Sequence, residues 1–305
     1  KGFFYLGTSK SECFMKTVYK VRIEKITPES EDAKSYIFVP VDFEEGLFDY
    51  MPGQFFMLEA EINRPETLTY DPATKQVIGS GKTVRVTEKK AYSIVSSPTE
   101  EGYIELLIKH ENGVFAPYFL EQAQVGDVYR FQQAQGKFMQ KFFESKGGMM
   151  ACWSSGSGIP STMSIMRYKL DKGLDTKVAV LDSNKTLKDV IYHERLKMMT
   201  GESEDFVSLF TVTREPEENL PTSDPVRVSY ASGRFWLNEP NTLKAFVGDE
   251  WQSYFNTICG ASTFINGKGR DEGGKLVKLG KGIQDHLLEV GITKNQIDVD
   301  QFYLQ

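Results

Sequence analysis

The sequence is poor in the residues that build metal centres and disulfide frameworks. Its 305 residues include three histidines and only three cysteines, at Cys13, Cys152 and Cys259. These cysteines are too widely spaced for a disulfide framework, a zinc site or an iron–sulfur cluster. We therefore expect no metal site. A chain without disulfides suits a reducing compartment, so the expected location is the cytoplasm.

Long apolar runs and an excess of positive charge are also missing. No apolar stretch approaches the roughly 20 residues of a membrane-spanning helix, and no signal-peptide pattern opens the sequence. The formal net charge of −6 argues against wholesale nucleic-acid binding. The composition, with 40% hydrophobic and 26% charged residues, is typical of a globular protein, and the length suits one large or two ordinary domains.

The first half of the chain has the pattern of β-structure. Apolar and charged residues alternate over Tyr19–Glu24, as expected for a strand with one buried face. Further strands are predicted at Ser35–Pro40, Gln54–Ala60, Thr83–Thr87, Tyr92–Val95, Tyr103–Lys109 and Val128–Gln133. Short strands separated by turns favour a closed antiparallel barrel. Ile62–Lys90 is long for a connection, and is either an extended hairpin turning at Asp71–Lys75 or a partly mobile loop.

The second half alternates apolar strands with helices, which predicts an α/β domain with a parallel sheet covered on both faces. The predicted strands are Met149–Trp153, Thr176–Asp182, Phe206–Thr213, Tyr254–Cys259 and Gln296–Tyr303, with helices over Thr186–Met199 and Gly282–Val290. Ser145–Gly148 interrupts both patterns. We therefore expect an antiparallel β-barrel domain at residues 1–145 and a Rossmann-like domain at residues 146–305.

A glycine turn links the first strand of this second domain to a helical pattern. It reads Ser155-Gly156-Ser157-Gly158-Ile159-Pro160. Glycines let the backbone approach an anion, and the free N–H groups at a helix start bind phosphate. Proline suits the first helical turn, where its missing N–H costs nothing. Ser161 stands where the usual dinucleotide motif has its third glycine, so an ordinary strand-to-helix turn remains an alternative.

Five motifs then occur in a fixed order. They are Pro52-Gly53-Gln54, Lys90-Ala91-Tyr92-Ser93-Ile94-Val95-Ser96, Gly156–Pro160, Thr213-Arg214-Glu215 and Ile258-Cys259-Gly260, and the chain closes on Asp300-Gln301-Phe302. In this order and spacing the chain resembles the ferredoxin–NADP reductase superfamily from about Lys16 to Phe302. The resemblance implies FAD in the barrel and NAD(P)H on the parallel sheet.

The resemblance also implies which residues bind the flavin. Residues Lys90, Ala91, Tyr92 and Ser93 match the family's Arg-x-Tyr-Ser signature, in which the tyrosine stacks on the isoalloxazine and the serine bonds near N5. Lysine replaces arginine, so it can neutralise a pyrophosphate but cannot grip it with two bonds. The second pyrophosphate motif falls on Gly113-Val114-Phe115-Ala116, where Ala116 lacks the usual hydroxyl. FAD is expected, with FMN as the alternative.

Hydride transfer is expected at Ser93, Cys259 and Asp300. The family's cysteine approaches the nicotinamide C4, and here Cys259 and Gly260 occupy that motif. A carboxylate two residues before a C-terminal aromatic corresponds to Asp300 and Phe302. Aspartate is one methylene shorter than the family's glutamate, which shortens the reach of this expected proton relay.

The choice of nicotinamide cofactor is expected to depend on Thr213 and Arg214. Similar triplets in NADP-linked members hold the adenosine 2′-phosphate, and an arginine fork matches phosphate oxygens. Arg227, Tyr230 and Arg234 follow and are expected to close the site. The triplet favours NADP, with NAD as the alternative cofactor and a solvated loop of mixed charge as the alternative reading of these residues.

The resemblance implies a flavoprotein reductase that moves electrons between NADPH and a ferredoxin-type or flavodoxin-type one-electron carrier through FAD. One alternative is an NADH-dependent reductase component of an oxygenase or larger redox complex. Another is a degenerate subunit that binds nucleotide without turnover, since Lys90 and Ala116 depart from the family pattern. The oligomeric state does not follow from the sequence.

Overall fold

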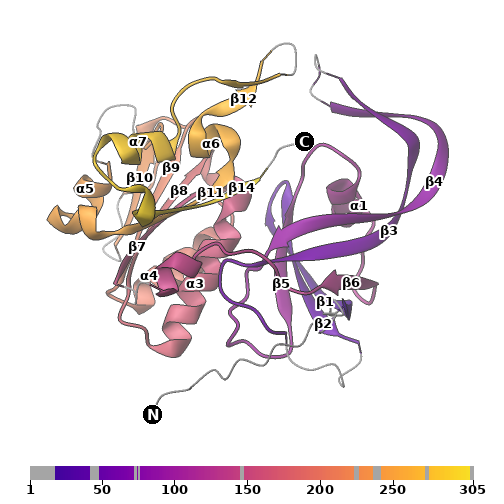
Figure 1. The fold of residues 1–305 in the computed structure, drawn as a ribbon, viewed down its shortest axis with the longest axis horizontal. Helices are drawn as coiled ribbons and strands as arrows, with labels where there is room; N and C mark the ends of the chain where they lie inside the picture. Colours follow the sequence, from indigo (N-terminus) through magenta and orange to yellow (C-terminus); the bar gives the residue numbers. More distant parts are fainter. Residues whose placement is uncertain are drawn as a thin grey trace, which may run out of the picture.

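The structure, a computed structural model, describes residues 18–41, 48–71, 74, 76–144, 148–222, 227–235, 242–271 and 275–302. The two halves of the chain form two sheets that lie next to each other (Figure 1). Several sequence-based expectations fall outside the described residues: Cys13, the domain boundary at 145/146, Tyr303 and the side chain of Phe302.

The first sheet is antiparallel and has six strands. They are β1 (Val18–Ser30), β2 (Ala33–Pro40), β3 (Phe55–Asp71), β4 (Gln76–Ser93), β5 (Ile104–Lys109) and β6 (Val128–Gln132). Their order is β4-β3-β6-β1-β2-β5. A single bridge between Ile94 and Leu106 joins the end of β4 to β5, and so brings the two edges of the sheet together. The predicted antiparallel domain is confirmed.

Strands β3 and β4 form one long hairpin that arches away from the barrel (Figure 1). Pairing runs from Phe55 with Ser93 to Asp71 with Gln76, with a register shift next to Pro65. The extended hairpin expected over Ile62–Lys90 is therefore formed. The separate strands predicted at Thr83–Thr87 and at Tyr92 belong to this one strand, because no residue between them breaks the ladder.

The barrel core is aromatic. Phe56 and Phe131 stack with ring centroids 5.1 Å apart, and Phe38 meets Phe131 edge-on at 4.9 Å. All three side chains are fully buried. Packed aromatic rings add to the energy gained from burial alone. The short helix α1 (Phe115–Glu121) packs on this core through Phe119.

The second sheet is parallel and also has six strands. They are β7 (Met149–Ser155), β8 (Lys177–Asn184), β9 (Phe206–Val212), β10 (Val228–Ser232), β11 (Phe255–Ala261) and β14 (Ile297–Phe302). Their order is β10-β9-β8-β7-β11-β14. All pairs are parallel, but the strands from β8 to β10 are added on one side of β7 and the later strands on the other side, so the strand order reverses between β7 and β11. The carboxyl ends of strands beside such a reversal form the crevice where parallel sheets bind ligands.

Helices cover both faces of the parallel sheet. The remaining elements are α2 (Gln140–Glu144), α3 (Ile159–Lys172), α4 (His193–Glu202), α5 (Thr242–Val247), α6 (Ser262–Asn266), α7 (Ile283–Glu289), a β12–β13 hairpin (Lys268–Arg270 and Leu276–Lys278) and 3₁₀ turns at Gly156–Gly158, Leu187–Asp189, Glu217–Asn219, Asp249–Ser253 and Lys294–Gln296. Side chains alternate between faces: Cys152 packs toward α3, and Trp153 toward α6 and α7. The predicted parallel α/β domain is confirmed.

Two parts of the second domain differ from expectation. The helix predicted over Thr186–Met199 is split, because Tyr192 takes a left-handed conformation at φ +60 before α4 begins. Strand β10 and the β12–β13 hairpin were not predicted. Among the described residues, none of the helices is long and apolar enough to span a membrane.

The two domains share a continuous core on the α3 side of the parallel sheet. Val95 and Leu107 from the barrel pack in one cluster with Met163 and Met166 from α3. Residues after the barrel, including Phe142 of α2, complete this cluster. The apolar contact fixes the barrel against the nucleotide-binding sheet.

Glu29, near the end of β1, is expected to make the free energy of unfolding depend on pH. Burial raises the pKa of Glu29 to about 7, and Glu105 raises it further, against a bond from Ser35 Oγ at 2.6 Å. The folded state therefore holds this proton after the unfolded chain has lost it. The resulting stability is present at low pH and is lost as pH rises through about 7.

Glu29→Gln should therefore raise the unfolding free energy at pH 8 by about 1 kcal/mol, after allowance for solvent screening at a partly exposed group, and change it little at pH 5. Denaturant unfolding at the two pH values measures this difference. Glu31→Gln, at an exposed neighbouring position, is the matched control. An equal pH dependence in both variants would contradict the assignment.

Candidate functional site

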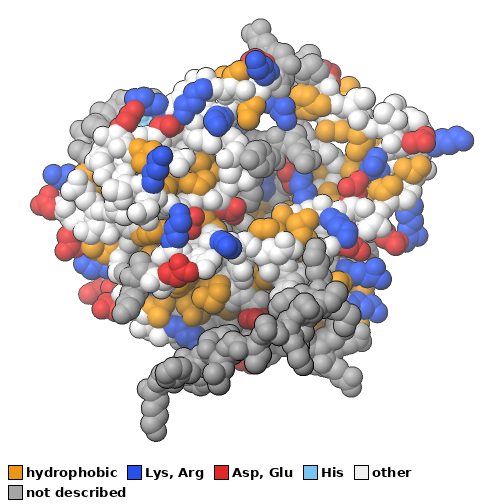
Figure 2. Space-filling view, in the orientation of Figure 1, with side chains coloured by type: hydrophobic (Ala, Val, Ile, Leu, Met, Phe, Trp, Pro, Cys, Tyr) orange, Lys and Arg blue, Asp and Glu red, His pale blue; other side chains and the backbone are white. Residues whose placement is uncertain are grey.

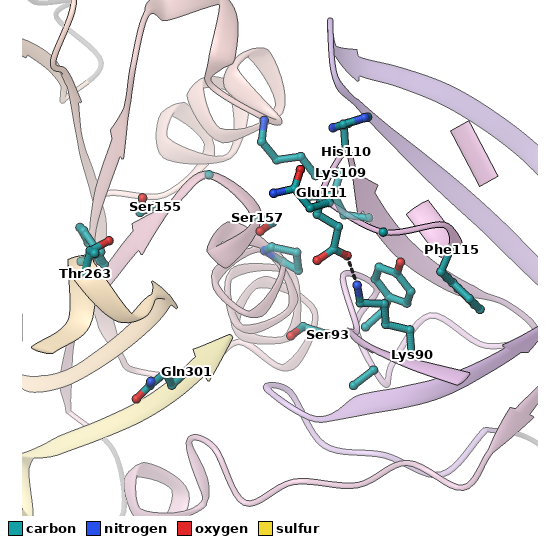
Figure 3. A pocket seen from close by; sticks show the side chains of 18 of the residues that line it. Lys90, Ser93, Lys109, His110, Glu111, Phe115, Ser155, Ser157, Thr263 and Gln301 are labelled. Atoms are coloured by element: carbon teal, nitrogen blue, oxygen red, sulfur yellow. Dashed lines mark ion pairs between the residues drawn. The ribbon is translucent and has the colours of Figure 1, made fainter. Parts of the chain in front are cut away.

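A cavity of about 1050 Å³ lies where the two domains meet (Figure 3). Its barrel wall comes from the end of β4 and the segment after β5, and its other wall from the carboxyl ends of β7, β8 and β9. The tip of the β3–β4 hairpin adds Leu68, Thr69, Tyr70 and Val77. On the face drawn in Figure 2, basic and acidic side chains are interspersed rather than gathered into one extended basic patch.

Tyr92 and Phe115 form an aromatic wall of the cavity. Their rings stack with centroids 6.1 Å apart and planes 29° from parallel. Tyr92 is buried, and its hydroxyl has no hydrogen-bond partner among the described residues. A buried hydroxyl without a partner requires an explanation, and a polar group of a bound cofactor would supply one. The aromatic wall and this hydroxyl fit a flavin.

The predicted pyrophosphate residues do not all face the cavity. Lys90 Nζ lies 2.8 Å from Glu111 Oε1 (Figure 3), so its charge is partly compensated inside the protein. Ala91, Gly113 and Val114 also line the cavity. Ala116 does not, because it belongs to the first turns of α1 and packs into the barrel core.

The glycine turn divides into two parts. Ser155, Gly156, Ser157 and Pro160 line the cavity, as the sequence predicts for a phosphate-binding turn. Gly156 has φ +54, and a Cβ there would meet only Lys109 Cε at 3.9 Å. Ile159 is fully buried in the shared core instead.

Gly158 serves packing. A Cβ at this position would lie 2.1 Å from the carbonyl oxygen of Cys259, so only glycine lets the turn approach β11 this closely. Gly158 does not line the cavity. Gly260 also packs against the turn, since its Cβ would meet Ser155 Cβ at 3.3 Å.

Ser93, Cys259 and Asp300 converge from three different strands. Ser93 Oγ donates to Asp300 Oδ2 over 3.5 Å, and Cys259 Sγ donates to the same oxygen over 3.7 Å. Burial raises the pKa of Asp300, opposed by the bonds from Cys259 and Ser93. Burial also raises the pKa of the Cys259 thiol, and the nearby Asp300 charge adds to this effect. The thiol therefore stays neutral, and the carboxyl is suited to holding a proton.

The residues predicted to hold the 2′-phosphate lie at both ends of the parallel strands, some at the carboxyl ends and some at the amino ends. Thr213 and Arg234 line the cavity. Arg214 is exposed at the carboxyl end of β9, where its backbone N–H donates to the carbonyl of Lys185 over 2.8 Å. This exposed arginine lies next to the cavity-lining Thr213.

Arg227 and Tyr230 are not brought to the cavity. Arg227 precedes β10 and donates to the carbonyls of Thr200 and Ser203, both over 2.8 Å, at the amino end of the strands. Tyr230 packs in the shared core, with its hydroxyl 2.9 Å from His193 Nε2. Both residues therefore hold α4 and its connection against the sheet. The backbone of Phe302 pairs with Ala261 at the carboxyl edge.

Sequence reasoning missed several cavity residues. Ser183 and Asn184 end β8 and Lys185 follows it, so the rule that ligands bind at the carboxyl ends of parallel strands could have found them. Asn184 donates to Asp182 over 2.6 Å, and Ser154 Oγ donates to the same carboxylate over 2.6 Å. Burial raises the pKa of Asp182 to about 6. This buried carboxyl group orders the floor of the cavity beneath the glycine turn.

Other missed residues have no local sequence signal. Lys109 and Gln301 line the cavity from the barrel and from β14, and Arg270 reaches it from the β12–β13 hairpin. Lys109 also forms an ion pair with Asp32. Among the described residues, no group of His, Cys, Asp and Glu side chains is arranged to hold a metal ion.

Comparison with known proteins agrees with this architecture. Residues 77–140 match the model of the oxidoreductase FAD-binding domain family. The ferredoxin reductase component of 3-ketosteroid-9-alpha-monooxygenase from Rhodococcus rhodochrous is 23% identical, over 80% of this chain and 58% of that protein. NADH-cytochrome b5 reductase 1 from Debaryomyces hansenii is 30% identical, over 47% of this chain and 51% of that protein.

The fold recurs in the cytochrome b5 reductase domain of Ulva prolifera nitrate reductase. That structure is 15% identical, with a TM-score of 0.67 over 94% of this chain and 97% of that domain. The architecture is therefore that of a two-domain flavoprotein reductase. The chain is similar to the superfamily of FAD- and NAD(P)H-binding flavoprotein reductases that includes the ferredoxin–NADP reductases. It spans about half the length of the curated relatives it matches.

Proposed function

We propose that this protein is an FAD-dependent NAD(P)H reductase that passes electrons to a separate one-electron carrier. The observation that carries the proposal is that Ser93, which lines the cavity, donates to Asp300 Oδ2, the same oxygen that accepts a bond from Cys259. A cavity-lining barrel residue is thereby bonded to two residues of the parallel sheet, beside the space where a flavin and a nicotinamide would have to meet. Holding two reactants in this way supplies much of the catalytic advantage.

The two cofactors would occupy opposite walls of the cavity. FAD, when bound, supplies a hydride acceptor that can release electrons one at a time. Tyr92 and Phe115 provide its stacking wall, and Lys90 provides positive charge near the Gly113 turn. Gly156 and Ser157 offer backbone N–H groups to the nicotinamide cofactor's phosphates. Ser93 and Asp300 hold a proton at the reacting edge, and the neutral Cys259 thiol packs beside them.

The carrier is proposed to be a ferredoxin-type or flavodoxin-type protein. One relative is named as the ferredoxin reductase component of a monooxygenase, which supports this choice of carrier. The second candidate function is an NADH-dependent reductase component of an oxygenase or other redox complex. The cytochrome b5 reductase and monooxygenase relatives favour this candidate.

Spectroscopy and rapid kinetics test the proposal. Purified protein, or protein incubated with FAD, should absorb visible light as oxidised flavin does. The flavin should be bleached on mixing with NADPH or NADH in a stopped-flow instrument, and re-oxidised by added ferredoxin, flavodoxin or cytochrome b5. A colourless protein that takes up neither FAD nor FMN would overturn the proposal. That result would favour a nucleotide-binding subunit without turnover.

Cofactor preference is the finer part of the proposal, and we propose NADP. The support is Arg214 next to the cavity-lining Thr213, with Lys185 and Arg234 also in the cavity wall. Arg214→Ala should raise KM for NADPH about tenfold and leave KM for NADH nearly unchanged, because only NADPH carries the 2′-phosphate. Arg227→Lys, at the other edge of the sheet, is the control. Equal changes for both cofactors would count against the assignment of Arg214 to the 2′-phosphate.

A further inference from the structure

A buried carboxylate of the barrel is held by two arginines of the other domain. Glu105 on β5 has a side chain only 4% exposed. Arg167 of α3 donates to Glu105 Oε2 over 2.7 Å, and Arg195 of α4 donates to Oε1 over 2.7 Å. Arg167 also donates to Glu100 over 3.1 Å, so two carboxylates balance two guanidinium groups. A buried charge is tolerated only when paired in this way.

The backbone of Glu105 is bonded to the segment that follows Ser93. The Val95 N–H donates to the Glu105 carbonyl over 2.9 Å. The Glu105 N–H donates to Ser96 Oγ over 3.1 Å. The carbonyl of Ser96 in turn accepts a bond from Ser164 of α3 over 2.7 Å. The strand end that carries Ser93 is thus tied to α3 through Glu105.

Helix α3 leads from these contacts to the opposite wall of the cavity. It begins at Ile159, directly after the glycine turn. That turn touches the Cys259 backbone through Gly158. A path therefore runs from Ser93 along the chain to Val95, through hydrogen bonds to Glu105 and Arg167, and then along α3 to Gly158, which packs against Cys259. The path joins the two walls on which flavin and nicotinamide would bind.

We propose that Glu105 is a positioning residue, which through Arg167 and Arg195 holds the two domains in the register that hydride transfer requires. The proposal rests on the proposed function. Glu105 does not line the cavity, so it acts on the reaction through the placement of Ser93 and the glycine turn. Hydride transfer is sensitive to such placement, because a shift of about 1 Å can slow a reaction on the order of 100-fold.

The test compares Glu105→Gln with a control on α3, the helix that carries its partner Arg167. Lys169→Met removes an ion pair between a buried lysine and the more exposed Asp205, with an Nζ to Oδ2 distance of 2.7 Å, which lies wholly within the second domain. In Glu105→Gln, flavin reduction at saturating NAD(P)H should slow by tenfold or more. Flavin retention and KM should change less than twofold. The primary isotope effect with deuterated cofactor should rise, since the hydride step becomes more rate-limiting. Lys169→Met should reduce its flavin at the wild-type rate.

A second readout needs no cofactor. Amide hydrogen exchange should increase at Val95 and across the start of α3 in Glu105→Gln and stay unchanged there in Lys169→Met. Should Glu105→Gln fail to fold, Arg195→Ala removes only the half-exposed partner and should give the same changes with smaller amplitude. Wild-type exchange and a wild-type reduction rate would overturn the proposal. Equal rate losses in both variants would also overturn it.

The failure of the proposed function is recognised separately. If the wild-type protein shows no flavin reduction, the proposed activity is wrong. The exchange experiment alone then decides whether Glu105 couples the two domains.

Discussion

Ser93→Ala is expected to slow flavin reduction by NAD(P)H on the order of 100-fold while changing KM for the cofactor less than twofold. Ser93 lines the cavity, and its hydroxyl lies 3.5 Å from Asp300 Oδ2. A group that positions or transfers a proton in the transition state contributes about 100-fold or more. An interaction made mainly in the transition state lowers kcat rather than raising KM. Stopped-flow absorbance at the flavin band measures the effect.

Two variants control this prediction. Ser157→Ala removes a hydroxyl from the glycine-turn wall, away from Asp300, and should act mainly on cofactor binding. Asp300→Asn should reproduce the Ser93→Ala rate loss, because both residues share the same bond. Reduction rates within twofold of wild type in both Ser93→Ala and Asp300→Asn would contradict the assigned site. A Ser93→Ala defect confined to KM would assign Ser93 to binding instead.

The secondary structure and the order of the two sheets could be predicted, because both follow from the periodic spacing of apolar residues. Alternating apolar residues located the barrel strands, and apolar runs with helices between them located the parallel sheet. The rule that ligands bind at the carboxyl ends of parallel strands predicted that Ser155, Thr213, Cys259 and Asp300 lie at the same end of the sheet. That rule depends on strand direction alone, and direction follows from the strand–helix alternation.

What failed depends on contacts that no local pattern reveals. Strand β10 was not recognised, so Arg227 was expected at the cavity although it precedes the strand and lies at the opposite edge. The interdomain role of Glu105 could not be predicted from the sequence. A single charged residue in an apolar strand has no recognisable role until its partners on α3 and α4 are known. Ala116 followed the family motif in sequence, but the helix turns it into the core.

Gly158→Ala should lower the unfolding free energy by about 3 kcal/mol, although alanine is the better residue for a helical turn. Gly158 has φ −80, which any residue adopts, so backbone strain is not the cause. Its Cβ would lie 2.1 Å from the Cys259 carbonyl oxygen, and backbone atoms on both sides cannot move apart cheaply. Overpacking of this kind costs about 1 to 3 kcal/mol, and more where the neighbour is rigid. Urea denaturation measures the change.

Gly156→Ala is the matched control two residues earlier. Gly156 has φ +54, and its Cβ would point into open space, so the expected cost is only the left-handed backbone penalty of about 1 kcal/mol. This variant should fold and should weaken NAD(P)H binding, because the added methyl group enters the cavity at the proposed phosphate site. The two glycines look equivalent in sequence, but only Gly158 touches β11. Equal stability losses in the two variants would show that the turn does not pack against the Cys259 backbone as described.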